Sequence, residues 1–211
     1  MLKIGVFDSG VGGLSVAHAI QVAMPDAEVL FMNDTDNVPY GTKSPKQLFN
    51  LVQPILNALS DEGCDVIVIA CNTVSTTIID QLKPVIKTPL IPMEPMVQAA
   101  AKLTKSGVIA VCATPTTLAS RRYEWLKNNY ASKIQVLEPN CSDWSSMIEN
   151  DKIDRQQITD RIEAVCQRGA DVIVLGCTHY HWIENLIIDL AHGRAQVLQP
   201  EQSVIKQLQQ L

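Results

Sequence analysis

The chain has 211 residues, of which 46% are hydrophobic, enough for a core in one domain or in two small ones. Its formal net charge is −5 and it has no run of Lys or Arg, which argues against nucleic acid or an anionic membrane surface as a partner. The six cysteines show no C-x-x-C spacing, so we expect free thiols in a cytoplasmic protein rather than a secreted disulfide framework. The N-terminus turns polar at Asp8 and no apolar run reaches roughly 18 residues, so we expect neither a signal peptide nor a membrane span.

Short apolar runs of the kind that form strands alternate with helical patterns along the chain. Eight strands are predicted, at residues 3–7, 28–32, 65–70 and 89–91 in the first half and at 107–112, 134–138, 171–176 and 195–199 in the second. Runs such as 66–69 are continuously apolar, as in strands that are buried on both faces. The pattern therefore predicts an α/β fold with parallel sheets that are flanked by helices.

Proline and glycine mark several helix boundaries. Ser-Pro at 44–45 and Thr-Pro at 114–115 each combine an N-cap residue with a first-turn proline, so a helix is predicted to begin at each. Pro54 falls inside the first of these helices and is expected to kink or divide it. Gly169 and Gly193 are predicted helix stops.

The two halves repeat one plan. Each has an apolar strand that ends on a cysteine, Cys71 in GCDVIVIACNT and Cys177 in GADVIVLGCTH. Asp8, at the end of the first strand, lies 63 positions before Cys71, and Ala113, after the fifth strand, lies 64 positions before Cys177. We therefore predict two pseudo-symmetric lobes, with the active site in the cleft between them at the carboxyl ends of the strands.

Both cysteines lie where a strand gives way to a predicted helix. The partial positive charge of a helix N-terminus is expected to lower the pKa of such a thiol below its free value of about 8.5. Two such thiols on opposite walls of a cleft can remove a proton from one face of a substrate and return one to the other, which inverts a stereocentre. The alternative is that the cysteines are buried structural residues, which is our interpretation of Cys64, Cys112 and Cys166 but not of the matched pair.

Two other chemistries are disfavoured. Cys177, His179 and His181 alternate and can share one face, but no second ligand cluster completes a tetrahedral metal site. The glycine loop that starts at Gly10 has Ser15 where a G-x-G-x-x-G nucleotide motif requires glycine.

Four segments, IGVFDSGVGGLSV, VPYGTKSP, ACNTVST and LGCTHY, occur in order and closely resemble the glutamate racemases of the aspartate/glutamate racemase superfamily, from residue 3 to about residue 205. The resemblance implies a two-lobed α/β enzyme with no cofactor and no metal, in which two cysteines flank the substrate's α-carbon. It implies that Cys71 acts on D-glutamate and Cys177 on L-glutamate. The first lobe would comprise residues 1–95 plus 200–211 and the second residues 96–199, with the proline-marked segment 88–96 as the crossing point.

Further roles carry over by position from the same resemblance. Asp8 would assist Cys71, and His179 and Glu149 would assist Cys177. Substrate-binding roles would fall on Asp8, Ser9, Tyr40, Gly41, Asn72, Thr73, Thr114, Thr117, Thr178 and His179. Hydroxyls and backbone N–H groups at loop-to-helix turns suit an anionic substrate. Asp8 and Ser9 are also placed to cap the following helix, a role that is compatible with the functional one.

The chain departs from the family pattern in three places. The segment CSDWSSMIEN (141–150) replaces a usually apolar stretch, and His181 stands where proline is common. Family members typically continue for several elements beyond the position of Leu211, but the catalytic residues named above all precede it, so we expect the chemistry to survive.

The function hypothesis is cofactor-independent racemisation of glutamate, which supplies D-glutamate for peptidoglycan synthesis. One alternative is a racemase of the same superfamily that acts on aspartate or a hydantoin, because one methylene is worth only about 1–3 kcal/mol of discrimination. Another is a shortened, non-catalytic relative that binds an amino acid. The expected partner is a small-molecule substrate, glutamate, with no nucleic acid and no membrane, and with a homodimer as an option.

Overall fold

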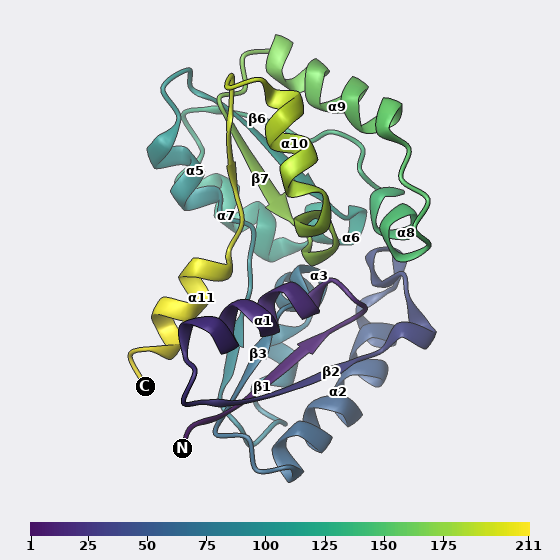
Figure 1. Cartoon of the computed structure of the whole chain (residues 1–211), viewed down its shortest axis with the longest axis vertical. Helices are drawn as coiled ribbons and strands as arrows, with labels where there is room; N and C mark the ends of the chain where they lie inside the picture. The colour runs from purple at the N-terminus through teal and green to yellow at the C-terminus, as the bar shows by residue number, and fades with distance from the viewer.

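The computed structural model describes residues 1–211, which form two four-stranded parallel sheets, one in each half of the molecule (Figure 1). The strand order is β2-β1-β3-β4 in the first sheet and β6-β5-β7-β8 in the second, so the repeat seen in the sequence is also a repeat of topology. All eight strands stand at the predicted places: β1 Lys3–Asp8, β2 Glu28–Asn33, β3 Val66–Ile69, β4 Leu90–Pro92, β5 Val108–Ala113, β6 Gln135–Leu137, β7 Val172–Gly176 and β8 Gln196–Leu198. The predicted α/β fold with parallel sheets is confirmed.

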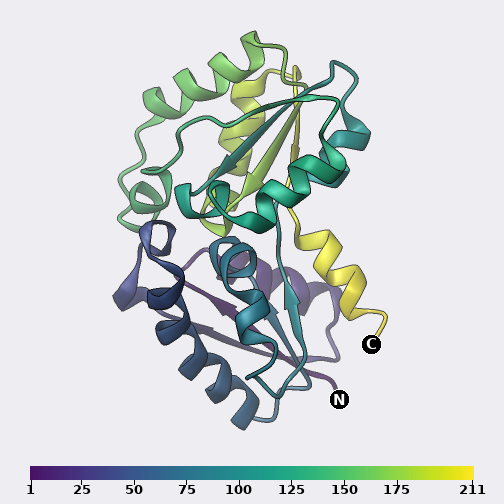
Figure 2. The ribbon, with the colours of Figure 1, turned by 180° about the vertical axis from the view of Figure 1, so that it is seen from behind.

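Helices cover both faces of the first sheet. Phe7 and Ile69 point to one face, where they pack against the helices that follow β2 and β3. Ile4 and Val68 point to the opposite face, which is covered by the first and the last helix of the chain. Figures 1 and 2 show these two helices side by side, with both chain termini in this half. The elements are α1 Gly13–Ala23, η1 Thr35–Asn37, η2 Tyr40–Thr42, α2 Pro45–Asp61, α3 Asn72–Thr77, α4 Ile79–Leu82 and α11 Glu201–Leu208.

The second sheet is covered in the same way. Cys112 and Leu175 face a core that α8, α9, η3 and α10 complete, while Val111 and Val174 face α5 and α7. The elements are α5 Val97–Leu103, α6 Pro115–Leu118, α7 Arg121–Tyr130, α8 Trp144–Glu149, α9 Arg155–Gln167, η3 Thr178–Ile183 and α10 Glu184–Ala191. The chain passes from the first sheet to the second between β4 and α5, at the segment that the prolines mark. None of these helices has the length and apolar composition that a bilayer crossing requires.

Most of the helix-boundary predictions are confirmed. The Ser44 side chain accepts a hydrogen bond from the Gln47 N–H and forms a capping box at the start of α2. Gly169 and Gly193 have φ values of 90° and 72° just beyond α9 and α10, as helix-ending glycines do. Of the two outcomes expected at Pro54, a kink or a division of the helix, the division is wrong, because α2 is continuous through Pro54. Pro54 lies on the exposed face of α2, as does Asn50, so the Asn50 carbonyl that loses its N–H partner is left next to solvent.

Candidate active site

A cavity of about 320 Å³ lies where the carboxyl ends of the two sheets face each other. Residues that directly follow β1, β3, β5 and β7 line it, together with the segment around η2 and one face of α8. The lining residues are Ser9, Thr35, Val38, Pro39, Tyr40, Gly41, Thr42, Cys71, Asn72, Thr73, Thr114, Ser142, Ser145, Ser146, Glu149, Asn150, Cys177, Thr178 and His179. A wider hollow of about 600 Å³ near α5 and α11 has neither cysteine nor histidine in its wall, so the smaller cavity is the candidate site.

Cys71 forms one wall of the cavity. It lies two residues beyond the end of β3 and is the N-cap residue of α3, with its Sγ 3.6 Å from the Ser9 Oγ. The expectation that the helix N-terminus lowers the pKa of this thiol is wrong: burial, together with the charge of Asp8, raises the pKa of Cys71 to about 12. These effects outweigh the hydrogen bonds that Cys71 makes with the Val74 N–H and with the Ser9 hydroxyl, which act in the opposite direction. Cys71 is therefore a thiol at neutral pH in this state of the protein.

Asp8 lies just behind the cavity wall and is completely buried. Its carboxylate accepts a hydrogen bond of 2.8 Å from the N–H of Gly13, the first residue of α1. Asp8 therefore also pairs a backbone N–H group at the start of this helix. It also accepts one of 3.1 Å from the hydroxyl of Thr178, which belongs to the other half of the molecule. Burial raises the pKa of Asp8, although the charge of His179 and the backbone N–H groups offset part of that effect.

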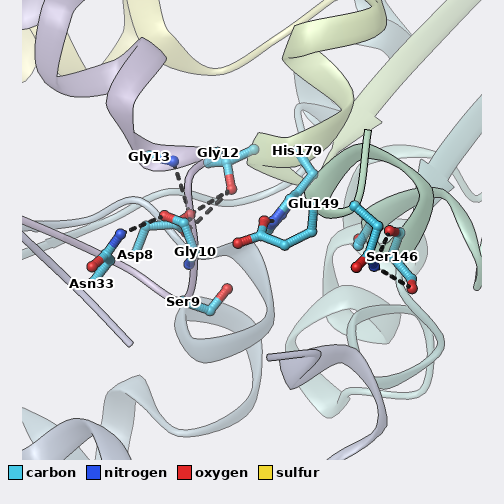
Figure 3. A network of polar contacts seen from close by, with 12 residues as sticks. Asp8, Ser9, Gly10, Gly12, Gly13, Asn33, Ser146, Glu149 and His179 are labelled. Carbon is cyan, nitrogen blue, oxygen red and sulfur yellow. Dashed lines mark hydrogen bonds and ion pairs between the residues drawn. The ribbon is translucent and has the colours of Figure 1, made fainter. Parts of the chain in front are cut away.

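Cys177 lines the same cavity from the second half of the molecule and is the N-cap residue of η3, directly after β7. Its Sγ lies 3.5 Å from the Ser145 Oγ and 3.8 Å from the His179 Nδ1. The other ring nitrogen of His179 is 2.6 Å from the Glu149 Oε2, and Figure 3 shows this pair beside the loop at Gly10. Burial alone lowers the pKa of His179, but Cys177 and the charges of Asp8 and Glu149 outweigh it and raise that pKa to about 10. His179 is therefore an imidazolium at neutral pH.

Two glycines allow the halves to meet around the cavity. A Cβ atom at Gly12 would lie 2.6 Å from the backbone nitrogen of His179, across the boundary between the halves. A Cβ atom at Gly41 would lie 2.7 Å from the Cβ of Thr114. Both distances are shorter than real Cβ contacts, so only glycine permits this closure of the site.

The remaining predicted residues supply polar groups. Thr73 and Thr114 come from different halves, and their hydroxyls are 3.0 Å apart. Thr117 is hydrogen-bonded to both but is fully buried behind them and does not line the cavity. The Tyr40 hydroxyl donates to Asp34 over 2.6 Å, and burial with that contact raises the pKa of Tyr40.

Asn72 stands out in this polar wall. It is 2% exposed, and both its amide nitrogen and its amide oxygen are buried without a hydrogen-bond partner in the protein. Buried polar atoms are almost always paired, so an unpaired amide in a cavity wall is a group available to a ligand.

The sequence prediction missed the serines of α8 and its flanks. Ser145 and Glu149 are four residues apart, which places them on one face of the helix, and a test for such spacing would have found the serine once Glu149 was assigned. His181, considered above as a metal ligand, is instead hydrogen-bonded to Glu201 of α11 over 3.0 Å. No group of three or more His, Cys, Asp or Glu side chains is arranged to hold a metal ion.

Known proteins resemble this chain in sequence and in fold. The model of the Asp/Glu/hydantoin racemase family matches residues 14–207. The glutamate racemase of Herpetosiphon aurantiacus is 35% identical to the chain over 99% of the chain and 84% of its own length. A glutamate racemase structure from Bacillus anthracis superposes with a TM-score of 0.86 at 27% identity, covering 99% of this chain and 80% of that one. One from Francisella tularensis in complex with D-glutamate gives a TM-score of 0.83 at 27% identity, with the same coverage.

Proposed function

The chain belongs to the Asp/Glu/hydantoin racemase family, and on that premise we propose that it interconverts L- and D-glutamate by proton transfer between two cysteines and the α-carbon. One observation carries the proposal: Cys71 and Cys177 line the same cavity, each from the tip of the equivalent strand of its own sheet. A substrate bound between them would present one face of its α-carbon to each sulfur.

The proposed reaction moves one proton at each face. The thiolate of one cysteine takes the α-proton, and the electron pair of the broken C–H bond stays on the α-carbon, where the neighbouring carboxylate delocalises it. The thiol of the other cysteine then donates its proton to the opposite face. We assign proton removal from L-glutamate to Cys177 and from D-glutamate to Cys71. Each turnover leaves the second cysteine as the thiolate, ready for the reverse direction.

Charged neighbours support this assignment. At neutral pH the His179 imidazolium is held by Glu149 and lies 3.8 Å from the Cys177 sulfur. On the other side, the buried carboxyl of Asp8 is close enough for its charge to raise the pKa of Cys71. We propose that Asp8 assists Cys71 and that the His179–Glu149 pair assists Cys177.

The composition of the cavity suits an amino acid. Its wall contains no Lys and no Arg, so carboxylates would be held by hydroxyls and N–H groups, as at Ser9, Thr73 and Thr178. The unpaired amide of Asn72 offers one donor and one acceptor to the same ligand. The absence of lysine also leaves no amine in the wall for a Schiff base.

The test is a racemisation assay of the purified chain with L- and D-glutamate and with both enantiomers of aspartate. We expect turnover of both glutamate enantiomers, with a bell-shaped pH profile of kcat/KM because one cysteine must be a thiolate and the other a thiol. Faster turnover of aspartate would favour the alternative substrate, and binding of glutamate without turnover would favour a non-catalytic relative. A rate that rises steadily to high pH would contradict the two-thiol scheme.

We further propose that the product serves peptidoglycan synthesis in the cytoplasm, which rests on the resemblance to glutamate racemases. Expression of the chain in a bacterium that requires external D-glutamate should restore growth without the supplement. Failure of an active, well-expressed enzyme to do so would contradict this biological role.

A further inference from the structure

Each cavity cysteine has one serine hydroxyl as a close partner, but the two serines come from unrelated positions. Ser9 directly follows β1, in the same half as Cys71, and its Oγ is 3.6 Å from that sulfur. Ser145 lies on α8, and its Oγ is 3.5 Å from the Cys177 sulfur. The Tyr180 hydroxyl is a second polar neighbour of the Ser145 hydroxyl.

The internal repeat explains why the second site needs a hydroxyl from elsewhere. Thr114 directly follows β5, as Ser9 directly follows β1, so it occupies the equivalent place in the second sheet. Its hydroxyl is hydrogen-bonded to Thr73 and Thr117, each over 3.0 Å, and is not a partner of Cys177. The last residue of β1 is Asp8, whereas the last residue of β5, the equivalent strand, is Ala113, which has no polar side chain. At the positions equivalent to Ser9 and Asp8, the second half therefore has no polar group that contacts Cys177.

Helix α8 carries the replacements for both (Figure 1). Ser145 and Glu149 are four residues apart on α8, so they share one face; Ser145 contacts Cys177, and Glu149 pairs with His179. The neighbouring Trp144 is fully buried and packs edge-on against Tyr180 of η3, with ring centroids 5.1 Å apart.

Two more contacts fix α8 relative to the loop of Cys177. The Tyr180 hydroxyl donates to the Cys141 carbonyl over 2.7 Å, at the entry to α8. Asp143, the N-cap residue of α8, forms a two-pronged ion pair with Arg161 of α9. These contacts anchor α8 on the side away from the cavity. They fix the backbone at Ser145 and so keep its hydroxyl near the Cys177 sulfur.

We propose that Ser145 is a positioning residue for Cys177, whose hydroxyl donates a hydrogen bond to the thiolate and accepts one from the thiol. A serine hydroxyl can fill both roles by rotation about its C–O bond, so it stays paired in each half of the proton-transfer cycle. An aliphatic side chain at this position would leave the thiolate with His179 alone. This inference rests on the proposed function for its role in turnover, but the hydrogen bond itself can be tested without turnover.

The experiment compares Ser145→Thr with Ser145→Val, two side chains of similar shape, of which only the first has a hydroxyl. The rate of alkylation of Cys177 by iodoacetamide is measured against pH and followed by mass spectrometry on the tryptic peptide 169–194, which contains no other cysteine. Alkylation of Cys71 in the same samples is the internal control, and Ser132→Ala, an exposed serine outside the cavity, is the control variant.

We expect Ser145→Val to move the pH midpoint of Cys177 alkylation upward by about one pH unit, which corresponds to a tenfold loss of thiolate at a given pH below it. Ser145→Thr and Ser132→Ala should keep the wild-type midpoint, and the Cys71 midpoint should stay in place throughout. In the racemisation assay, Ser145→Val should lower kcat about tenfold with little change in KM.

Equal midpoints for Ser145→Val and Ser145→Thr would overturn the inference, as would parallel shifts at Cys71 and Cys177, which would indicate a general disturbance of the fold. If the wild-type protein does not racemise glutamate but the alkylation midpoint still shifts as expected, the proposed function fails and the Ser145 contact stands. If the protein racemises glutamate and the midpoint does not move, the Ser145 inference alone fails.

Discussion

Substitution of Gly12 by alanine should impair the reaction without harming the fold of either half. Gly12 has φ −55° and ψ −38°, a helical conformation that alanine adopts without strain. The added Cβ would lie 2.6 Å from the backbone nitrogen of His179 and 2.7 Å from the Thr178 Oγ1, whereas ordinary contact begins at 3.4 Å. A backbone atom cannot move out of the way by a change of rotamer, as a flexible side chain can. The two halves must therefore separate by about 0.8 Å at this point, the difference between 3.4 and 2.6 Å.

Thr178 directly follows Cys177, so the displacement acts on one of the two proposed proton-transfer groups. A misplacement of about 1 Å can cost roughly a hundredfold in rate, and we expect a loss of that order in kcat/KM for Gly12→Ala. The assay is racemisation of L-glutamate, with thermal unfolding as the check on folding and Leu14→Ala, an exposed position in the first turn of α1, as the control. A Gly12→Ala enzyme with wild-type kcat/KM would refute the idea that the site depends on this close approach.

Three further predictions follow from the site. Glu149→Gln should lower the pKa of His179 from about 10, as an NMR titration of the imidazole would show. Because folding raises the pKa of His179, the contribution of its protonation to stability is complete below pH 6.5 and is lost as the pH rises toward 10. The free energy of unfolding, measured with denaturant, should therefore fall across that pH range. The fall should be less steep in Glu149→Gln. Asn72→Ala should raise KM for glutamate about tenfold without lowering the melting temperature, since its amide has no partner in the protein; an unchanged KM would remove Asn72 from the binding site. Dialysis against EDTA should leave the rate unchanged, and a loss that added metal restores would contradict this.

The strands and the matched cysteines could be predicted because their signals are local. A continuous apolar run such as 66–69 can be satisfied only by burial on both faces, and a cysteine at its end is fixed at the tip of the strand. The cap at Ser44 and the stops at Gly169 and Gly193 are equally local, since each depends on the backbone of its own turn.

Two of the misses depend on contacts between residues that are far apart in the sequence. The pKa of Cys71 is set by burial and by Asp8, which outweigh the helix terminus visible in the sequence. The serine at 145 is half-buried on a helix of six residues, and its contact with Cys177 depends on how that helix packs, as at Trp144 against Tyr180. Pro54 was misjudged for a different reason: the Asn50 carbonyl that loses its N–H partner is exposed, so it is left next to solvent while the helix continues.

Exchange of the substrate α-proton with solvent in single-cysteine variants tests the central claim most directly. NMR in deuterated buffer would follow the α-proton of each glutamate enantiomer with Cys71→Ala and with Cys177→Ala. We expect neither variant to racemise, Cys71→Ala to exchange slowly the α-proton of L-glutamate only, and Cys177→Ala to exchange that of D-glutamate only. A single-cysteine variant that racemises at a rate near that of the wild type, or that exchanges both enantiomers equally, would contradict the assignment of one cysteine to each face of the α-carbon.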